Sequence, residues 1–312
     1  MEYRKLGRAG LKVSAVGIGT NQIGSKVDLE TTIRIIHRAL DLGVNLIDTA
    51  DNYADGRSEE YLGKVLKGNW DRVVLATKVG GLPMGDGPND DGASRYHIAY
   101  GLEASLRRLQ VDHIDLYQIH RWDPNTPIEE TLRALDDFVR AGKVRYIGAS
   151  NFAAWQLCRA NDVAELLNLT PFVSIQPHYN MLHREIEKEM MPYAQAFNLG
   201  ILPYFPLAGG FLTGKYRRGH VPPGSRGRED KRVQAHFTDG SYTLIEKLKA
   251  FAEGHGRTMV QLAIAWLLAQ PQVSSVISGV TGVDHLENNV KAHDWHLGAG
   301  ELNQISDLLG GK

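Results

Sequence analysis

The sequence predicts an α/β fold, a closed (β/α)8 barrel of the TIM class, with an N-terminal β-hairpin and a long loop after strand 7. Short runs rich in β-branched residues alternate with longer runs of helical periodicity, and eight such units favour a closed barrel over an open sheet. Three helix-to-strand junctions, DLGVNLID, AGKVRYIG and NLGILPYF, place Gly43, Gly142 and Gly200 where a left-handed C-cap is expected. No linker divides the 312 residues, so we expect one barrel domain over 1–312.

The individual elements follow from the same patterns. The opening segment 2–13 is expected to form a hairpin that plugs the bottom of the barrel. Barrel strands are expected at 13–19, 45–48, 73–77, 114–120, 144–150, 172–177, 201–207 and 273–278. Helices are expected at 29–42, 58–66, 94–109, 128–140, 153–167, 184–197, 243–252, 258–269 and 283–290, with Asp28 and Ser58 as N-caps of the first two. The irregular stretch 206–240 is too long for a passive connection, which indicates a functional loop.

Composition excludes several classes of protein. Lys and Arg total 35 and Asp and Glu total 36, a net charge of -1 that argues against a general nucleic-acid binder. The 43% hydrophobic content argues against a disordered chain. One cysteine, Cys158, rules out an intramolecular disulfide and a cysteine zinc cluster, and we expect no metal. Neither a secretion signal nor a membrane-spanning run is visible, so we expect a cytoplasmic protein with a small-molecule partner, monomeric or homo-oligomeric.

Two nucleotide-binding motifs nearly match. Gly17 and Gly19 follow the first barrel strand, but Gln22 stands where the dinucleotide fingerprint needs a third glycine. The segment from Gly209 to Lys215 has the spacing of a phosphate-binding loop, but Tyr216 replaces the required Ser or Thr and no helix follows. Neither motif predicts its usual fold, although the Gly-Lys pair remains a candidate for contacting phosphate.

Polar residues gather where the predicted strands end. Because catalytic residues of such barrels lie at the carboxyl ends of the strands, these residues are expected to meet at one rim. A structural ion-pair cluster is the alternative explanation. The residues concerned are Gly19, Thr20, Asp48, Thr77, Lys78, Gln118, His120, Ser150, Asn151, Gln176, Tyr204 and Ser278.

The rim residues make chemical sense as a set for acid catalysis. Lys78 needs a counter-charge in the barrel mouth, and Asp48 is the obvious one. Tyr53 lies on the loop that leaves the same strand as Asp48. A nearby ammonium favours the phenolate, so we expect the pKa of Tyr53 to fall from about 10 toward the working pH and Tyr53 to protonate a carbonyl oxygen. His120 would orient that carbonyl.

The segments DTADNY, LATK, LYQIH, GASNF, IQPHYN and PLAGGFLTGKY, in this order across almost the whole chain, closely resemble the aldo-keto reductases. The resemblance implies a (β/α)8 barrel that binds NADP(H) or NAD(H) without a Rossmann fold and acts on a carbonyl or sugar substrate. It implies the catalytic tetrad Asp48, Tyr53, Lys78 and His120, with Tyr53 as general acid. Ser150, Asn151 and Gln176 would hold the nicotinamide carboxamide, and Tyr204 would stack on the ring.

The resemblance also implies the rest of the cofactor site. Gly19, Thr20 and Asp48 would line it, and Leu207, Gly209 and Lys215 would follow the pyrophosphate. Further cofactor contacts are expected from Phe205, Pro206, Gly279, Thr281, His285, Asn288 and Asn289, the last two near the adenine. Asn21, Trp122 and Tyr179 are expected to line the substrate pocket beside Tyr53 and His120, with core packing as the alternative for Trp122.

This chain departs from the family pattern in two places. Phe205 stands where relatives often carry a Ser that contacts the pyrophosphate. The segment 279–285 offers Thr281 and His285 but no Lys or Arg, whereas a 2′-phosphate prefers a charged, forked donor. We therefore hypothesise a relaxed cofactor preference or real use of NADH.

Charge is distributed unevenly along the chain. Between Lys215 and Arg232, seven basic and two acidic residues give a local charge of +5, which is either a solvated loop or one that folds over an anionic dinucleotide. Other functions remain open at this point. One is a cofactor-binding regulatory or scaffold protein like the potassium-channel β subunits, and another is a barrel isomerase or lyase that uses Lys78 as a Schiff base.

Overall fold

The computed structural model describes residues 1–83 and 85–310. Its central feature is a parallel sheet of eight strands in the order β10-β3-β4-β5-β6-β7-β8-β9. The strands are β3 (Val16–Gly19), β4 (Leu46–Asp48), β5 (Val74–Val79), β6 (Ile114–Ile119), β7 (Val144–Ser150), β8 (Ser174–Gln176), β9 (Gly200–Ile201) and β10 (Val276–Gly279). The sheet closes because Ile201 N donates to Gln272 O at 2.7 Å and Ile277 N donates to Pro203 O at 2.9 Å. The predicted (β/α)8 barrel is therefore confirmed.

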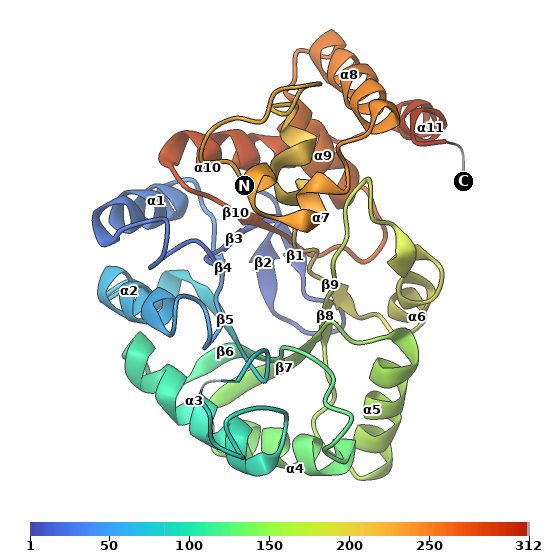
Figure 1. The fold of residues 1–312 in the computed structure, drawn as a ribbon. Coiled ribbons are helices and arrows are strands. Elements are labelled where there is room, and N and C mark those ends of the chain that lie inside the picture. Colours follow the sequence, from blue (N-terminus) through green and yellow to red (C-terminus); the bar gives the residue numbers. More distant parts are fainter. Residues whose placement is uncertain (84, 311–312) are drawn as a thin grey trace.

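Helices surround the strands on the outside (Figure 1). They are α1 (Leu29–Asp41), α2 (Arg57–Val65), α3 (Arg95–Leu109), α4 (Ile128–Arg140), α5 (Ala154–Leu166), α6 (Met190–Ala196), α7 (Lys231–Gln234), α8 (Asp239–Gly254), α9 (Met259–Leu268), α10 (Val283–Val290) and α11 (Ala299–Leu308). Short 3-10 turns lie at Trp70–Arg72, Glu185–Glu187, Ala208–Thr213, Arg226–Arg228 and Lys291–Asp294. Within the described residues, no helix combines the length and apolar character that crossing a membrane requires.

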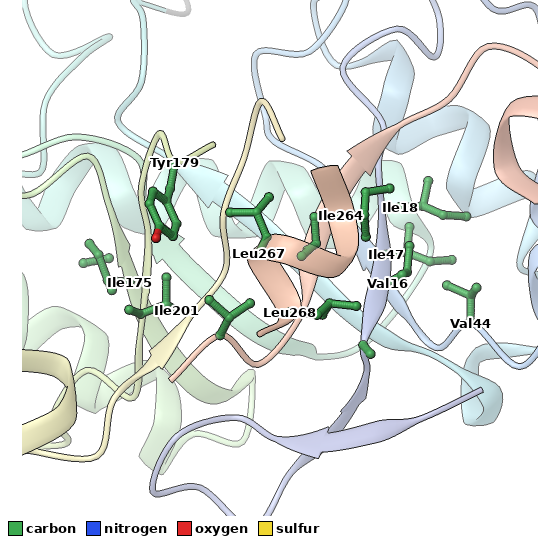
Figure 2. Close-up of a cluster of buried hydrophobic side chains, with 14 of the residues drawn as sticks. Val16, Ile18, Val44, Ile47, Ile175, Tyr179, Ile201, Ile264, Leu267 and Leu268 are labelled. Atoms are coloured by element: carbon green, nitrogen blue, oxygen red, sulfur yellow. The ribbon is translucent and has the colours of Figure 1, made fainter. Parts of the chain in front are cut away.

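The core lies between the helices and the outer face of the barrel. Figure 2 shows Ile264, Leu267 and Leu268 of α9 between side chains of β3 and β4 on one side and of β8 and β9 on the other. Each of these three residues is at most 7% exposed, and full burial of such a side chain contributes about 1.5–3 kcal/mol. Burial of both faces of the parallel strands explains why the barrel strands read as continuous apolar runs.

The N-terminal hairpin consists of β1 (Tyr3–Lys5) and β2 (Lys12–Ser14), paired antiparallel. Leu6, Ala9 and Val13 of this segment are buried in one cluster with inward-facing strand residues such as Leu46 and Leu116. The hairpin thus closes one end of the barrel, as predicted, and leaves the opposite rim for the site.

Several local predictions are wrong. Ser58 lies inside α2, whose N-cap is Gly56, because the Ser58 hydroxyl hydrogen-bonds Thr20 and Thr49 in the barrel instead. The left-handed residue before β9 is Asn198 at φ 50°, and Gly200 is already in the strand.

Other boundaries differ as well. The predicted helix 184–197 is broken into a 3-10 turn and α6, and the predicted strand 201–207 is reduced to β9 because its prolines lack an N–H. The stretch 206–240 carries two 3-10 turns and α7, and α11 is an addition that the sequence reading did not include.

Candidate active site

A cavity of about 640 Å³ opens at the carboxyl ends of the strands. Parallel strands bring residues that are far apart in sequence to this rim. Every predicted cofactor residue lines it, as do Tyr53 and His120, while Lys78 lies fully buried directly beneath. The predicted residues in the lining are Gly19, Thr20, Asn21, Asp48, Tyr53, His120, Ser150, Asn151, Gln176, Tyr204, Phe205, Pro206, Leu207, Gly209, Lys215, Gly279, Thr281, His285, Asn288 and Asn289.

An ion pair lies at the floor of the cavity. Lys78 Nζ of β5 is 2.7 Å from Asp48 Oδ2 of β4, and the side chains are 0% and 2% exposed. Lys78 also donates to Thr49 O at 2.7 Å. Burial lowers the pKa of Lys78, but Asp48 and Tyr53 outweigh it and raise that pKa above its usual value. Lys78 is therefore an ammonium, which does not suit the alternative of a Schiff-base nucleophile.

Tyr53 sits above this pair. Its Oη is 3.4 Å from Lys78 Nζ, and Nζ lies 4.9 Å from the centre of the Tyr53 ring. Burial is the largest effect on the pKa of Tyr53 and raises it. Lys78 opposes this rise, whereas Asp48 and Asp51 add to it, and the net pKa lies above the usual value. The expectation that the pKa of Tyr53 falls toward working pH is wrong for this structure, and Tyr53 is a protonated phenol at neutral pH.

His120 follows β6 and lies edge-on to Tyr53, with the ring centres 6.2 Å apart. Burial, then Lys78 and Arg121, lower the pKa of His120 to about 3. The imidazole is consequently neutral across the physiological range and carries a single N–H. It can hydrogen-bond a carbonyl oxygen without supplying a charge.

The three residues predicted to hold a carboxamide do come together. Asn151 Nδ2 donates to Ser150 Oγ at 3.0 Å, and Ser150 Oγ donates to Gln176 O at 2.9 Å. Gln176 Nε2 donates to Asp48 Oδ1 at 2.8 Å, which orients the amide and connects this group to the ion pair. Amide and hydroxyl groups in this arrangement offer both donors and acceptors, as a carboxamide ligand requires.

Tyr204 completes this part of the cavity. Its hydroxyl donates to Asn151 Oδ1 at 2.8 Å, and its ring stacks on His178 with the ring centres 5.5 Å apart. His178 thus supports the Tyr204 ring beside the cavity that Tyr204 lines. A flat aromatic surface fixed in this way suits stacking of a planar ring.

The loop after Tyr204 has an unusual backbone. Phe205, Ala208, Gly209 and Gly210 all have φ between 47° and 99°, in the left-handed region. A Cβ on Gly209 would lie 2.4 Å from a Val233 methyl, so only glycine fits there. Successive backbone N–H groups in tight turns that include left-handed residues can form a concavity that binds anions.

The basic loop, residues 215–232, contributes three cations to the cavity lining, Lys215, Arg226 and Arg232. Arg226 lies 5.7 Å and Arg232 4.9 Å from the Phe205 ring centre. Arg226 reaches across to Asn21 Oδ1 at 3.5 Å, whereas Arg218 pairs with Glu246 outside the lining. Part of the loop therefore folds over the cavity and part is a solvated surface.

The far end of the cavity is polar but carries little charge. Thr281 Oγ1 lies 3.0 Å from His285 Nδ1, and both residues are exposed. Asn289 Nδ2 donates to Ser278 Oγ at 2.6 Å, and Asn288 Oδ1 accepts from Gln261 Nε2 at 2.9 Å.

Two predicted substrate-pocket residues are not in the lining. Tyr179 is 0% exposed, donates to Glu187 Oε1 at 2.7 Å and belongs to the hydrophobic core (Figure 2), so its pocket assignment is wrong. Trp122 is half-buried and packs edge-to-face on Phe152 and Trp155, with ring centres 5.3 and 5.7 Å away. Core packing, the alternative for Trp122, is the better description.

Sequence reasoning missed three features of this site. Lys26 and Arg121 line the cavity. Their positions in the loops that follow β3 and β6 could have identified them from the sequence. Asp51 is 2% exposed, and among the described residues no side chain hydrogen-bonds either of its carboxyl oxygens. Burial and the nearby Glu59 raise the pKa of Asp51 to about 7, and no sequence signal distinguished it from an ordinary loop aspartate.

Comparison with known proteins places these residues in context. The family model described as Aldo/keto reductase family matches residues 15–309. A protein of Oryza sativa subsp. japonica named "Probable voltage-gated potassium channel subunit beta" is 39% identical over 302 residues, covering 94% of this chain and 92% of that protein. "Aldo-keto reductase YhdN" of Bacillus subtilis (strain 168) is 36% identical over 317 residues, covering 99% and 94%. "L-glyceraldehyde 3-phosphate reductase" of Escherichia coli O157:H7 is 34% identical over 331 residues, covering 97% and 94%. The family match and the last two names support a reductase role.

Proposed function

Because the chain belongs to the aldo/keto reductase family, we propose that residues 1–312 form one catalytic domain that is an NAD(P)(H)-dependent oxidoreductase. Its reaction is hydride transfer between nicotinamide C4 and the carbonyl or alcohol carbon of an aldehyde, a ketone or an aldose. The observation that carries the proposal is the Tyr53 hydroxyl, 3.4 Å from a buried ammonium that is itself paired with Asp48 at 2.7 Å.

Tyr53 is the general acid and base in this proposal. Its raised pKa keeps the phenol protonated at neutral pH, so the proton is available to a carbonyl oxygen in the cavity. As that proton leaves, Lys78 stabilises the phenolate at short range, and Asp48 keeps Lys78 charged. Neutral His120 donates a second hydrogen bond that orients the carbonyl.

The donor set of the cavity fits a nicotinamide dinucleotide, which when bound supplies or accepts the hydride. Ser150, Asn151 and Gln176 would hold the carboxamide, and Tyr204 would cover one face of the ring. The loop from Leu207 to Lys215, with its left-handed residues Ala208, Gly209 and Gly210, would hold the pyrophosphate together with Arg226, which lines the same cavity. The residues assigned to the adenosine end are Gly279, Thr281, His285, Asn288 and Asn289.

We propose that this chain uses NADH as well as NADPH. The segment 279–285 brings Thr281 and His285 to the cavity but no Lys or Arg, so it lacks the forked cation that favours a 2′-phosphate. Comparable kcat/KM for the two cofactors is the expected result. A preference for NADPH of about a hundredfold would overturn this part of the proposal, because a charge-assisted phosphate contact accounts for a factor of that order.

A second candidate is a cofactor-binding regulatory protein with little turnover, which the similarity to the Oryza sativa protein favours. Oxidation of NADPH and NADH is followed with a panel of aldehydes, ketones and aldoses for the wild type, Y53F and the control Y61F. We expect Y53F to lose at least about a hundredfold in kcat, the usual contribution of a general acid, and Y61F to retain activity. Cofactor binding without turnover of any carbonyl by the wild type would favour the regulatory candidate.

A further inference from the structure

The cavity has a strong excess of positive charge. Its lining includes Lys26, Arg121, Lys215, Arg226 and Arg232, whereas Asp48 is the single acidic lining residue among those the structure describes. Asp48 is already neutralised by Lys78 at 2.7 Å. The cations therefore have no internal counter-charge in the lining, which suits a cavity that takes up anionic ligands.

Three of these cations lie around the loop that follows Tyr204. Lys215 lies next to Gly210, with Nζ only 2.9 Å from the position that a Cβ of Gly210 would occupy, and Arg226 lies over Phe205. Both therefore sit at the left-handed loop assigned to the pyrophosphate. Arg232 is held by Asp230 through contacts of 2.8 and 3.0 Å.

Arg121 follows His120 directly and lines the same cavity. Burial raises the pKa of Tyr204 and Arg121 opposes that rise, and Arg121 also helps to lower the pKa of His120. Its charge is thus felt at His120, which would orient the carbonyl, and at Tyr204, which would cover the ring of the cofactor. The pyrophosphate loop has its own cations, so this position is left for the substrate.

Arg121 has no ion-pair partner within residues 1–83 and 85–310. The nearby acid, Asp123, is committed to the backbone of Ala93 and Asn125 and to the Thr126 hydroxyl at 2.6–2.9 Å. The guanidinium is exposed in the cavity and presents a planar fork that matches carboxylate and phosphate.

We propose that Arg121 binds an anionic group on the substrate, a carboxylate or a phosphate ester, so that this site prefers anionic aldehydes to neutral ones. The inference rests on the proposed reductase function and adds the substrate class. A bidentate contact between a guanidinium and such a group fixes orientation as well as adding affinity, which holds the carbonyl near Tyr53 and His120.

The test compares matched substrates that differ in charge. The carboxylate pair is 4-carboxybenzaldehyde and its methyl ester, and the phosphate pair is glyceraldehyde 3-phosphate and glyceraldehyde. We expect the wild type to favour the anionic member by at least about tenfold in kcat/KM. R121Q should lower the anionic-to-neutral ratio by about 10–100-fold, mainly through KM, and R121K should recover part of it. R107Q is the matched control, because Arg107 is exposed on α3 outside the cavity, and it should keep the wild-type ratio.

Binding separates this inference from the proposed function. Calorimetry with cofactor-loaded protein measures the affinity for 4-(hydroxymethyl)benzoate and for its methyl ester, neither of which needs to react. Tighter binding of the carboxylate in the wild type but not in R121Q supports the anion site even if no carbonyl is turned over. Equal binding of the two compounds, or an R121Q ratio equal to that of the wild type, overturns it whether or not the reductase activity is found. The two substrate pairs show whether carboxylate or phosphate is preferred.

Discussion

The buried carboxyl group of Asp51 predicts how the free energy of unfolding of the whole chain depends on pH. The side chain is 2% exposed, and among the described residues no side chain hydrogen-bonds either carboxyl oxygen. Burial and the nearby Glu59 raise the pKa of Asp51 from 3.8 to about 7. The native state therefore keeps a proton that the unfolded state has already released between these two values, and the free energy of unfolding falls as pH rises through that range.

The size of the effect follows from the shift. A change from 3.8 to about 7 spans about three pH units, and at about 1.4 kcal/mol per unit the penalty reaches ~4 kcal/mol above pH 7. About a third of this penalty is already present at pH 5. The substitution D51N keeps the shape but cannot ionise, so its stability relative to the wild type should increase by about 3 kcal/mol between pH 5 and pH 8.

Urea denaturation of the wild type and of D51N at pH 5 and pH 8 measures this difference. The other titrating groups contribute equally to the pH dependence of both proteins, so their contributions cancel. The control is D91N, since Asp91 is exposed in a loop. D91N should track the wild type at both pH values. A difference between D51N and the wild type that is the same at pH 5 and pH 8 would refute the reasoning, because Asp51 would then ionise alike in both states.

Three further predictions follow from the same structure. K78M should lower the free energy of unfolding by about 3–5 kcal/mol, because it leaves the buried Asp48 carboxylate without a counter-charge. In urea titrations, K78M/D48N should regain much of the lost stability. G7A should lower it by about 2–5 kcal/mol, since Gly7 has φ +54° and a Cβ would lie 2.3 Å from a backbone nitrogen of β9; G10A, where a Cβ meets nothing, is the control in thermal unfolding. His120, with a pKa of about 3, should show no titration of its ring nitrogens between pH 5 and pH 8 in ¹⁵N NMR spectra, and a transition near pH 6.5 would contradict this assignment.

The strand and helix order could be read from sequence because both depend on local patterns. The helices Ile128–Arg140 and Val283–Val290 and the strand Val144–Ser150 have the predicted bounds. The failures occur where a tertiary contact overrides a local preference. Ser58 is an example, because its hydroxyl hydrogen-bonds barrel residues instead of capping the helix.

The candidate site was predictable for a similar reason. In a parallel barrel, strand ends must meet, so Asp48, Lys78 and His120 could be placed together without a structure. Loop residues carry no such constraint. Tyr179 turns into the core against Trp266 of α9, with ring centres 5.4 Å apart, whereas Arg121 turns to the cavity. Whether the side chain of a loop residue points into the core or into the cavity depends on packing against distant elements. Sequence spacing does not encode this direction.

The pKa of Tyr53 shows the difference between knowing which groups are near and knowing their net effect. Sequence reasoning considered Lys78 as an ammonium that would act on Tyr53. In the structure Asp48 lies 2.7 Å from Lys78, so Tyr53 experiences a dipole whose two ends have opposite effects on the phenolate. The field of such a pair falls off faster with distance than that of one charge, whereas the cost of burying a phenolate is undiminished. Burial therefore determines the direction, and the same Asp48 that keeps Lys78 charged also keeps Tyr53 protonated, as a proton donor must be.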